Sequence, residues 1–144
     1  MLQTAAAIQN SPLHGIQTPR AVLEWSKRVE KAGECMHPLT EYPRPAMRRD
    51  SYENLNGPWQ YAITASAQRP AGWDGEILVP YAPECRASGV GRTLQPGQWL
   101  HYHRYFAPPA GTGGRVLLHF GAVDYACAVQ VNGHLVGGHR GGYW

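Results

Sequence analysis

The chain has 144 residues, of which 43% are hydrophobic, so it is the size of one domain and leaves no room for a second of ordinary size. Its 17 glycines and 12 prolines favour many short elements joined by turns over a few long helices, and we expect an all-β protein. The net charge of +3 comes from scattered arginines without a basic cluster, which argues against a nucleic-acid-binding face. The three cysteines are widely spaced and predict neither a disulfide framework nor a zinc motif.

Residues 1–40 are expected to form an arm outside the main domain. Residues 1–19 are polar and lack periodicity, which predicts disorder, and Val22, Trp25 and Val29 are spaced as in a short amphipathic helix over 20–31. No basic segment precedes a continuous apolar stretch, so we expect neither a signal peptide nor a membrane span, and therefore a cytoplasmic protein. Pro43 and Pro45 exclude regular structure and predict an extended strap on the surface of the domain.

From residue 57 onward the side-chain pattern has the period of two that is typical of strands. Strands are expected over 58–63, 76–79, 99–106, 115–120 and 125–131, with a long irregular loop over 80–98. Asn132-Gly133 predicts a type I′ hairpin turn, because both positions tolerate positive φ. Such a turn places Val131 opposite His134 and Val129 opposite Val136. This many strands with long connecting loops predict a jelly-roll β-sandwich over residues 41–144.

No catalytic residue is expected in this chain. A glycosidase needs two carboxyl groups facing each other across a cleft, and no motif pairs any two here. Ser88-Gly-Val-Gly91 lacks the spacing of a nucleophile elbow, and the glycines of 137–142 lack the Lys and Ser/Thr of a phosphate-binding loop. The period-two aromatic residues are expected to pack in the core rather than to stack on sugars: Trp59, Tyr61, Tyr102 and Tyr125.

His101 and His103 form the strongest competing signal. Two residues apart on a strand, both imidazoles point to the same face, as a metal-binding pair would. Cupin-type jelly rolls begin their metal site with such a pair, but they need a Glu three or four residues later, where this chain has Phe106 and Ala107. We therefore interpret the pair as surface histidines on a solvent-facing strand, and we expect no metal and no other cofactor.

A string of ordered blocks from residue 41 onward resembles the non-catalytic N-terminal domain of family 2 glycoside hydrolases. The most specific block runs from Arg115 to Tyr125, continues through Val129-Gln-Val-Asn-Gly133 and ends at Tyr143. The other blocks that carry the resemblance are Glu41–Pro45, Asn54–Trp59, Gly75–Pro80 and Tyr102–Phe106. The family resemblance implies a galactose-binding-like jelly roll that is incomplete at its C-terminus.

The resemblance also implies a parent enzyme that hydrolyses β-glycosides with retention, of the β-galactosidase or β-glucuronidase type. Its two catalytic glutamates would lie on a (β/α)₈ barrel, which needs roughly 200 residues or more. The implied partners are a β-glycoside carbohydrate and the catalytic barrel of the parent chain, with no nucleic acid and no membrane. Because an incomplete sandwich leaves open strand edges, we also expect poor solubility or a homo-oligomer.

Four residues are candidates for contacts with the sugar: His139 and Arg140 after the hairpin, Glu84 in the long loop, and Asp124 after a strand. Arginine and carboxylate groups form charge-assisted hydrogen bonds with hydroxyls. The alternative for each is a structural or interdomain contact, and for Asp124 a bond to nearby turn amides. Two other functions stay open, a free-standing carbohydrate-binding module and a cupin-like metal protein.

Overall fold

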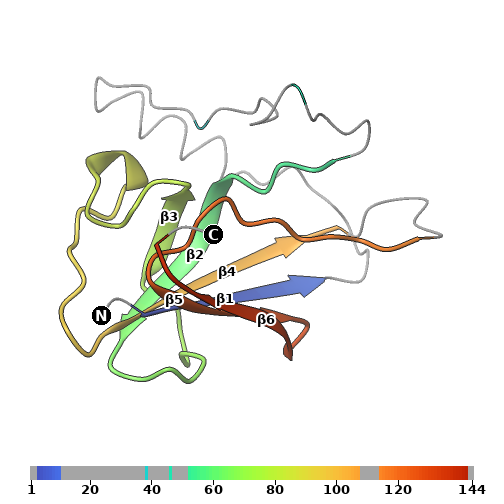
Figure 1. The fold of residues 1–144 in the computed structure, drawn as a ribbon. Coiled ribbons are helices and arrows are strands. Elements are labelled where there is room, and N and C mark those ends of the chain that lie inside the picture. The colour runs from blue at the N-terminus through green and yellow to red at the C-terminus, as the bar shows by residue number, and fades with distance from the viewer. Residues whose placement is uncertain (1–2, 11–37, 39–45, 47–51, 108–113, 143–144) are drawn as a thin grey trace.

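The computed structural model of the chain describes residues 3–10, 38, 46, 52–107 and 114–142. Its strands are β1 (Gln3–Asn10), β2 (Gly57–Thr64), β3 (Gly75–Val79), β4 (Trp99–Phe106), β5 (Ala126–Val131) and β6 (His134–Arg140), with a short 3₁₀ helix η2 (Arg86–Ser88). They form one hydrogen-bonded sheet in the order β3-β2-β4-β1-β5-β6 (Figure 1). The all-β class is therefore confirmed. No helix among the described residues is long and apolar enough to cross a membrane.

The core lies on one face of β2, β3 and β4. Side chains alternate along these strands, and antiparallel pairing sets Trp59 opposite Ile77 and Ile63 opposite Leu100. Trp59, Tyr61, Ile77 and Leu100 form a buried cluster. Leu94 from the long loop completes the cluster. The prediction that Trp59 and Tyr61 pack in the core is thus confirmed, and Tyr102 packs against the same cluster. For Tyr125 the prediction is wrong, because this residue is 37% exposed.

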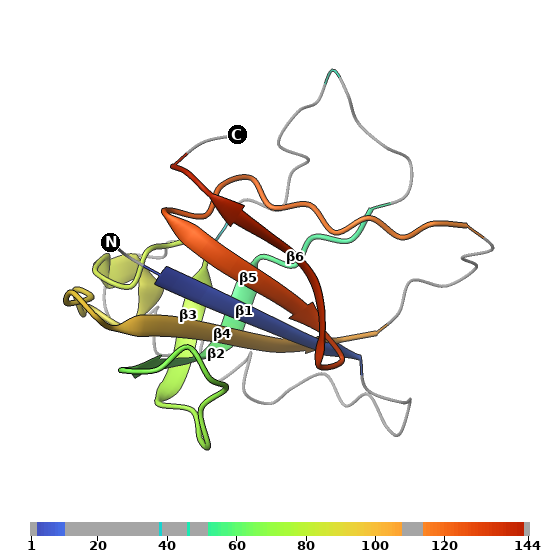
Figure 2. The same ribbon diagram turned by 60° about the horizontal axis from the view of Figure 1, so that its bottom comes forward.

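The strand β1 corrects the expectation of disorder for residues 3–10 of the predicted arm. Gln3–Asn10 pairs in parallel with β4 on one side, where Gln3 faces Trp99, and with β5 on the other, where Gln3 faces Ala126 (Figure 2). A strand held by backbone hydrogen bonds on both edges needs no alternating side chains of its own, and this alanine-rich segment carries no such pattern. The predicted helix over 20–31 and the strap over 41–45 lie outside the described residues.

The predicted strand over 115–120 is wrong. These residues have no strand structure, and Val116, Leu117 and Phe120 are 56%, 53% and 40% exposed. An alternating pattern supplies a face to bury, but a strand also needs a neighbour to accept its backbone hydrogen bonds. No strand of the described residues pairs with this segment.

The β5–β6 hairpin confirms the predicted turn. Asn132 and Gly133 have φ of 52° and 81°, and Val131 pairs with His134. The predicted pair of Val129 and Val136 is wrong, because the register shifts between Val129 and Gln130, so that Val129 faces Gly137. A bulge of this kind adds one residue to one strand, and here Val136 is left without a direct partner.

The turn makes a sharp prediction for stability. Gly133→Ala should lower the free energy of unfolding by about 1–2 kcal/mol, because a residue with a Cβ is penalised at positive φ. A Cβ at Gly133 would meet nothing within 4 Å, so the cost is conformational and not steric. Urea denaturation measures it. Gly137→Ala is the matched control, since its Cβ also meets nothing within 4 Å and its φ is not in the left-handed region. Equal losses in the two variants would contradict the turn assignment.

Candidate functional site

One end of the β5–β6 hairpin carries three of the four predicted sugar-contacting residues, Asp124, His139 and Arg140. We call them, with Tyr125, the hairpin-end cluster. All four side chains are exposed. Because His139 and Arg140 are successive residues of β6, their side chains point to opposite faces of the strand. Antiparallel pairing sets Cys127 opposite His139 and Ala126 opposite Arg140. The residues that directly precede β5 therefore lie next to the end of β6.

Local contacts hold this cluster in place. The guanidinium carbon of Arg140 lies 5.6 Å from the centroid of the Tyr125 ring, within the range of a cation–π contact. The backbone N–H of Gly141 donates to the carbonyl oxygen of Tyr125 at 2.6 Å. Asp124 Oδ1 lies beside Gly142, 3.7 Å from where a Cβ would be. The cluster therefore presents a cation over an aromatic ring, with a carboxylate on the residue before that ring.

Glu84 does not join the hairpin-end cluster. It is an exposed residue of the loop after β3, and its charge acts on Tyr102 of β4. Burial raises the pKa of Tyr102 to about 12, and the negative charge of Glu84 adds to the rise. The phenol of Tyr102 therefore keeps its proton at neutral pH. In the sheet, β4 and β5 are separated by β1.

The loop after β3 is organised by Ser88, whose side chain is fully buried. Its hydroxyl donates to the carbonyl oxygen of Cys85 at 2.6 Å and accepts from the backbone N–H of Val90 at 3.1 Å. A hydroxyl bound on both sides inside a loop serves the loop's own conformation. Ser88 is thus a structural residue, as the sequence indicates for this glycine-rich segment.

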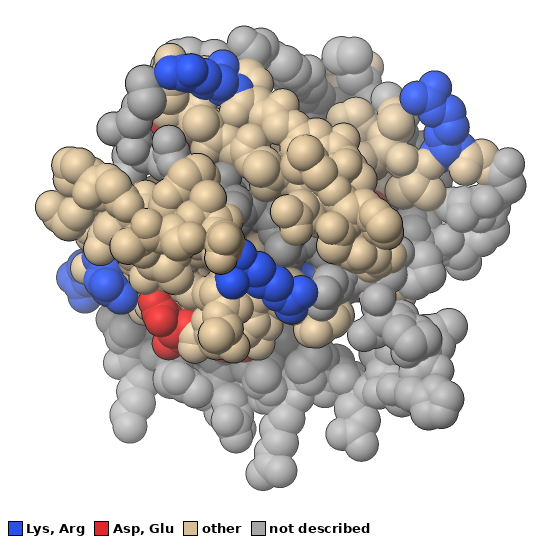
Figure 3. Space-filling model, turned by 90° about the horizontal axis from the view of Figure 1, so that it is seen from below, with Lys and Arg blue, Asp and Glu red and all other residues tan. Residues whose placement is uncertain are grey.

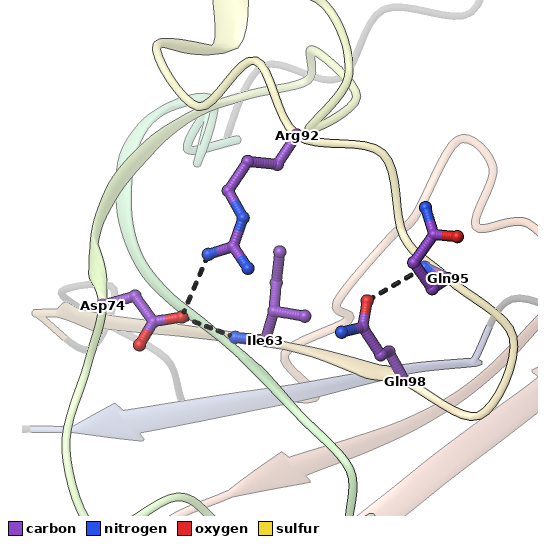
Figure 4. A network of polar contacts seen from close by, with 5 residues as sticks. All are labelled: Ile63, Asp74, Arg92, Gln95 and Gln98. Atoms are coloured by element: carbon purple, nitrogen blue, oxygen red, sulfur yellow. Dashed lines mark hydrogen bonds and ion pairs between the residues drawn. The ribbon is translucent and has the colours of Figure 1, made fainter.

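Asp74 fastens two loops to the sheet (Figure 4). Its carboxylate accepts from the backbone N–H of Ile63 at 2.9 Å and lies 3.8 Å from Nη1 of Arg92. Near by, Gln98 Oε1 accepts from the backbone N–H of Gln95 at 2.9 Å. The half-exposed ion pair contributes little by itself, so the bond to the end of β2 is the more important contact. The carboxylate of Asp74 therefore has a structural role.

The two histidines of β4 are buried, which corrects their interpretation as surface residues. His101 is 3% exposed and His103 is 1% exposed. His101 Nε2 lies 2.9 Å from the carbonyl oxygen of Ser66 and 2.9 Å from Thr64 Oγ1. Because a carbonyl only accepts, this nitrogen carries a hydrogen and donates it. The β2–β3 loop folds back over this face of the sheet, which an alternating pattern cannot reveal.

His103 lies in a cluster of flat side chains. Its Nδ1 donates to Gln60 Oε1 at 2.8 Å. Its ring stacks on Trp73, with centroids 4.9 Å apart and planes 13° apart, and meets Tyr105 edge-on at 4.6 Å. Burial lowers the pKa of His103, and the nearby positive charge of Arg69 lowers it further. The imidazole is therefore neutral at pH 7.

The described residues contain no group of three or more His, Cys, Asp or Glu side chains that could hold a metal ion. Sequence reasoning missed the cluster of Trp73, His103 and Tyr105. The sequence signal that could have revealed this cluster is Trp73 itself, a tryptophan between Gly72 and Gly75 in the turn-rich segment that joins β2 and β3.

Basic side chains stand apart from one another on the face seen in Figure 3, with uncharged residues between them.

No protein-family model and no curated protein matches the chain. The functional interpretation therefore depends on the residues and their geometry.

The lowered pKa of His103 predicts how stability depends on pH. Its unfolded-state pKa is about 6.5 and its folded-state pKa is lower, so below that pH the unfolded chain binds more protons and stability falls. We expect the melting temperature to drop between about pH 7.5 and about pH 5.5, and to drop less in His103→Gln, which removes the titrating group. Thermal melts at the two pH values measure this. His134→Gln, at an exposed position of the hairpin, should retain the wild-type drop. If the melting temperature of His103→Gln falls as far as that of the wild type, the lowered pKa of His103 is contradicted.

Proposed function

We propose that the chain is the accessory sugar-binding domain of a retaining glycoside hydrolase of the family 2 type, acting on β-galactosides or β-glucuronides. In this proposal, residues 41–144 belong to a jelly-roll sandwich and the catalytic glutamates lie on a barrel elsewhere in the parent protein. The observation that carries it is the hairpin-end cluster. The cluster follows the type I′ hairpin that forms part of the most specific block of the family resemblance.

The chemistry of this cluster suits sugar hydroxyls. A guanidinium donates several hydrogen bonds in a fixed plane, and a carboxylate accepts them. The Arg140 guanidinium lies over the Tyr125 ring, Asp124 is the residue before Tyr125, and Tyr125 is 37% exposed. Charged partners make hydroxyl hydrogen bonds about twice as strong as neutral ones. The cluster can therefore orient a sugar, although it offers no second carboxyl group for acid–base hydrolysis.

Exposed apolar side chains support the proposal that another protein unit packs against this domain. Leu135 and Val136 of the edge strand β6 are 69% and 59% exposed, and the segment with Val116, Leu117 and Phe120 adds further apolar surface. Apolar surface of this kind marks an interaction site more often than chance. We propose that the catalytic barrel of the parent chain covers it.

Kinetics test the sugar contact. The chain alone should not hydrolyse nitrophenyl β-galactoside or nitrophenyl β-glucuronide. In a parent protein that carries the proposed barrel, Arg140→Ala should raise KM at least tenfold, because a hydrogen bond to a charged group contributes about 1.5–3 kcal/mol. Arg115→Ala, which removes the same charge from an exposed site outside the cluster, should leave KM unchanged. Turnover by the chain alone, or an unchanged KM in Arg140→Ala, would reject the proposal.

Self-association tests the apolar surface. The isolated chain should form oligomers, because an open edge strand and exposed apolar residues pair with other copies. Leu135→Lys should shift the population towards monomer. Gln130→Lys is the control, since it adds the same charge to the exposed residue that faces Leu135 across the hairpin. Analytical ultracentrifugation measures both variants. A wild-type chain that sediments as a clean monomer would contradict this part of the proposal.

A further inference from the structure

A second polar and aromatic surface lies on the β3-β2-β4 half of the sheet, on the face opposite the core. Pairing across the three strands sets Glu76 opposite Gln60 and Gln60 opposite His103. Tyr105, two residues after His103, lies on the same face. The β2–β3 loop, green and projecting downward in Figure 1, brings Trp73 onto this row.

The aromatic part of this surface is rigid and only partly covered. His103 is almost fully buried because it is held between Trp73, Tyr105 and the Gln60 amide. It therefore supports the two outer rings from beneath. Tyr105 is 55% exposed and Trp73 remains partly exposed. A large ring that is fixed in position and open to solvent on one side is ready for a ligand, because little side-chain entropy is lost on binding.

Polar groups border these rings. Gln60 Oε1 accepts from His103, which fixes the orientation of the amide, and within the described part of the chain no hydrogen bond is made by its Nε2. This leaves two N–H donors at the surface. Glu76 next to it is exposed and can accept. Arg69 is exposed as well, and its charge is felt by His103.

We infer that this surface, formed by Trp73, Tyr105, Gln60, Glu76 and Arg69, binds a pyranose carbohydrate separately from the hairpin-end cluster. A pyranose ring has apolar C–H faces and hydroxyls around its edge. The faces match the open rings of Tyr105 and Trp73, while the edge matches an amide donor, a carboxylate acceptor and a guanidinium. The inference rests on the proposed sugar-binding function and adds to it a contact that needs no catalytic barrel.

Calorimetric titration of the 144-residue chain with methyl β-galactoside and with methyl β-glucuronide tests the inference. At least one sugar should bind with a millimolar Kd. Tyr105→Ala should weaken binding by about threefold to tenfold, as expected for the loss of one ring contact. Gln60→Glu keeps an oxygen acceptor for His103 but removes the N–H donors, and it should also weaken binding. Thermal melts of both variants check that they fold.

Tyr52→Ala is the matched control, because it removes a tyrosine that is 42% exposed and belongs neither to this surface nor to the hairpin-end cluster. Its Kd for the sugar should equal that of the wild type. No binding of either sugar, or binding that Tyr125→Ala weakens and Tyr105→Ala does not, would overturn the inference. These results can be told apart from failure of the proposed function, which is decided by KM of the longer protein and by Arg140→Ala.

Discussion

The buried contact of Trp59, Ile77 and Leu100 across three strands is the constraint on which the rest of the structure depends. Burying each of these side chains contributes about 1.5–3 kcal/mol, and a slip by one residue would turn all of them to the opposite face. Polar bonds at the start of β2 oppose such a slip. Trp59 Nε1 donates to the carbonyl oxygen of Leu55 at 2.8 Å, and Arg104 Nη1 donates to the same oxygen at 2.7 Å. Packing and hydrogen bonding therefore select one register.

This register also determines the character of the opposite face. If Leu100 and Tyr102 point into the core, His101 and His103 must point away from it. Burial there costs free energy unless polar groups are satisfied, and the structure satisfies them through Ser66 and Gln60. No buried side-chain nitrogen or oxygen among the described residues lacks a partner. The histidines are thus part of the structure, and the flat groups around them become the surface available to a ligand.

The sequence predicted the elements whose structure depends on local chemistry. It did not predict those whose structure depends on pairing with strands far along the chain. Alternation located β2 and β4, a short apolar run ending at Pro80 located β3, and the demand of Asn132-Gly133 for positive φ located the hairpin turn. The strand β1 was missed, because its place depends on two strands far along the chain. Residues 115–120 have the pattern of a strand but no described partner, and the bulge at Val129 moved Val136 out of register. Likewise, hairpin geometry brings Arg140 to Tyr125, the residue after Asp124, whereas nothing in the sequence places Glu84 relative to them.

The distribution of carboxylates in the described part of the chain is consistent with the proposed binding function. Asp74 is bonded to the backbone of Ile63, and Glu84 acts on Tyr102 from the loop after β3. Glu76 lies on β3 and Asp124 at the start of β5, on opposite sides of the sheet order. Hydrolysis of a glycoside needs two such groups about 5–10 Å apart across one bond. Under the proposed sugar-binding function, separated acceptors beside exposed rings would instead provide orientation, each holding one part of the sugar. Rigid strands make that orientation precise, and this is the contribution that a neighbouring catalytic unit would require.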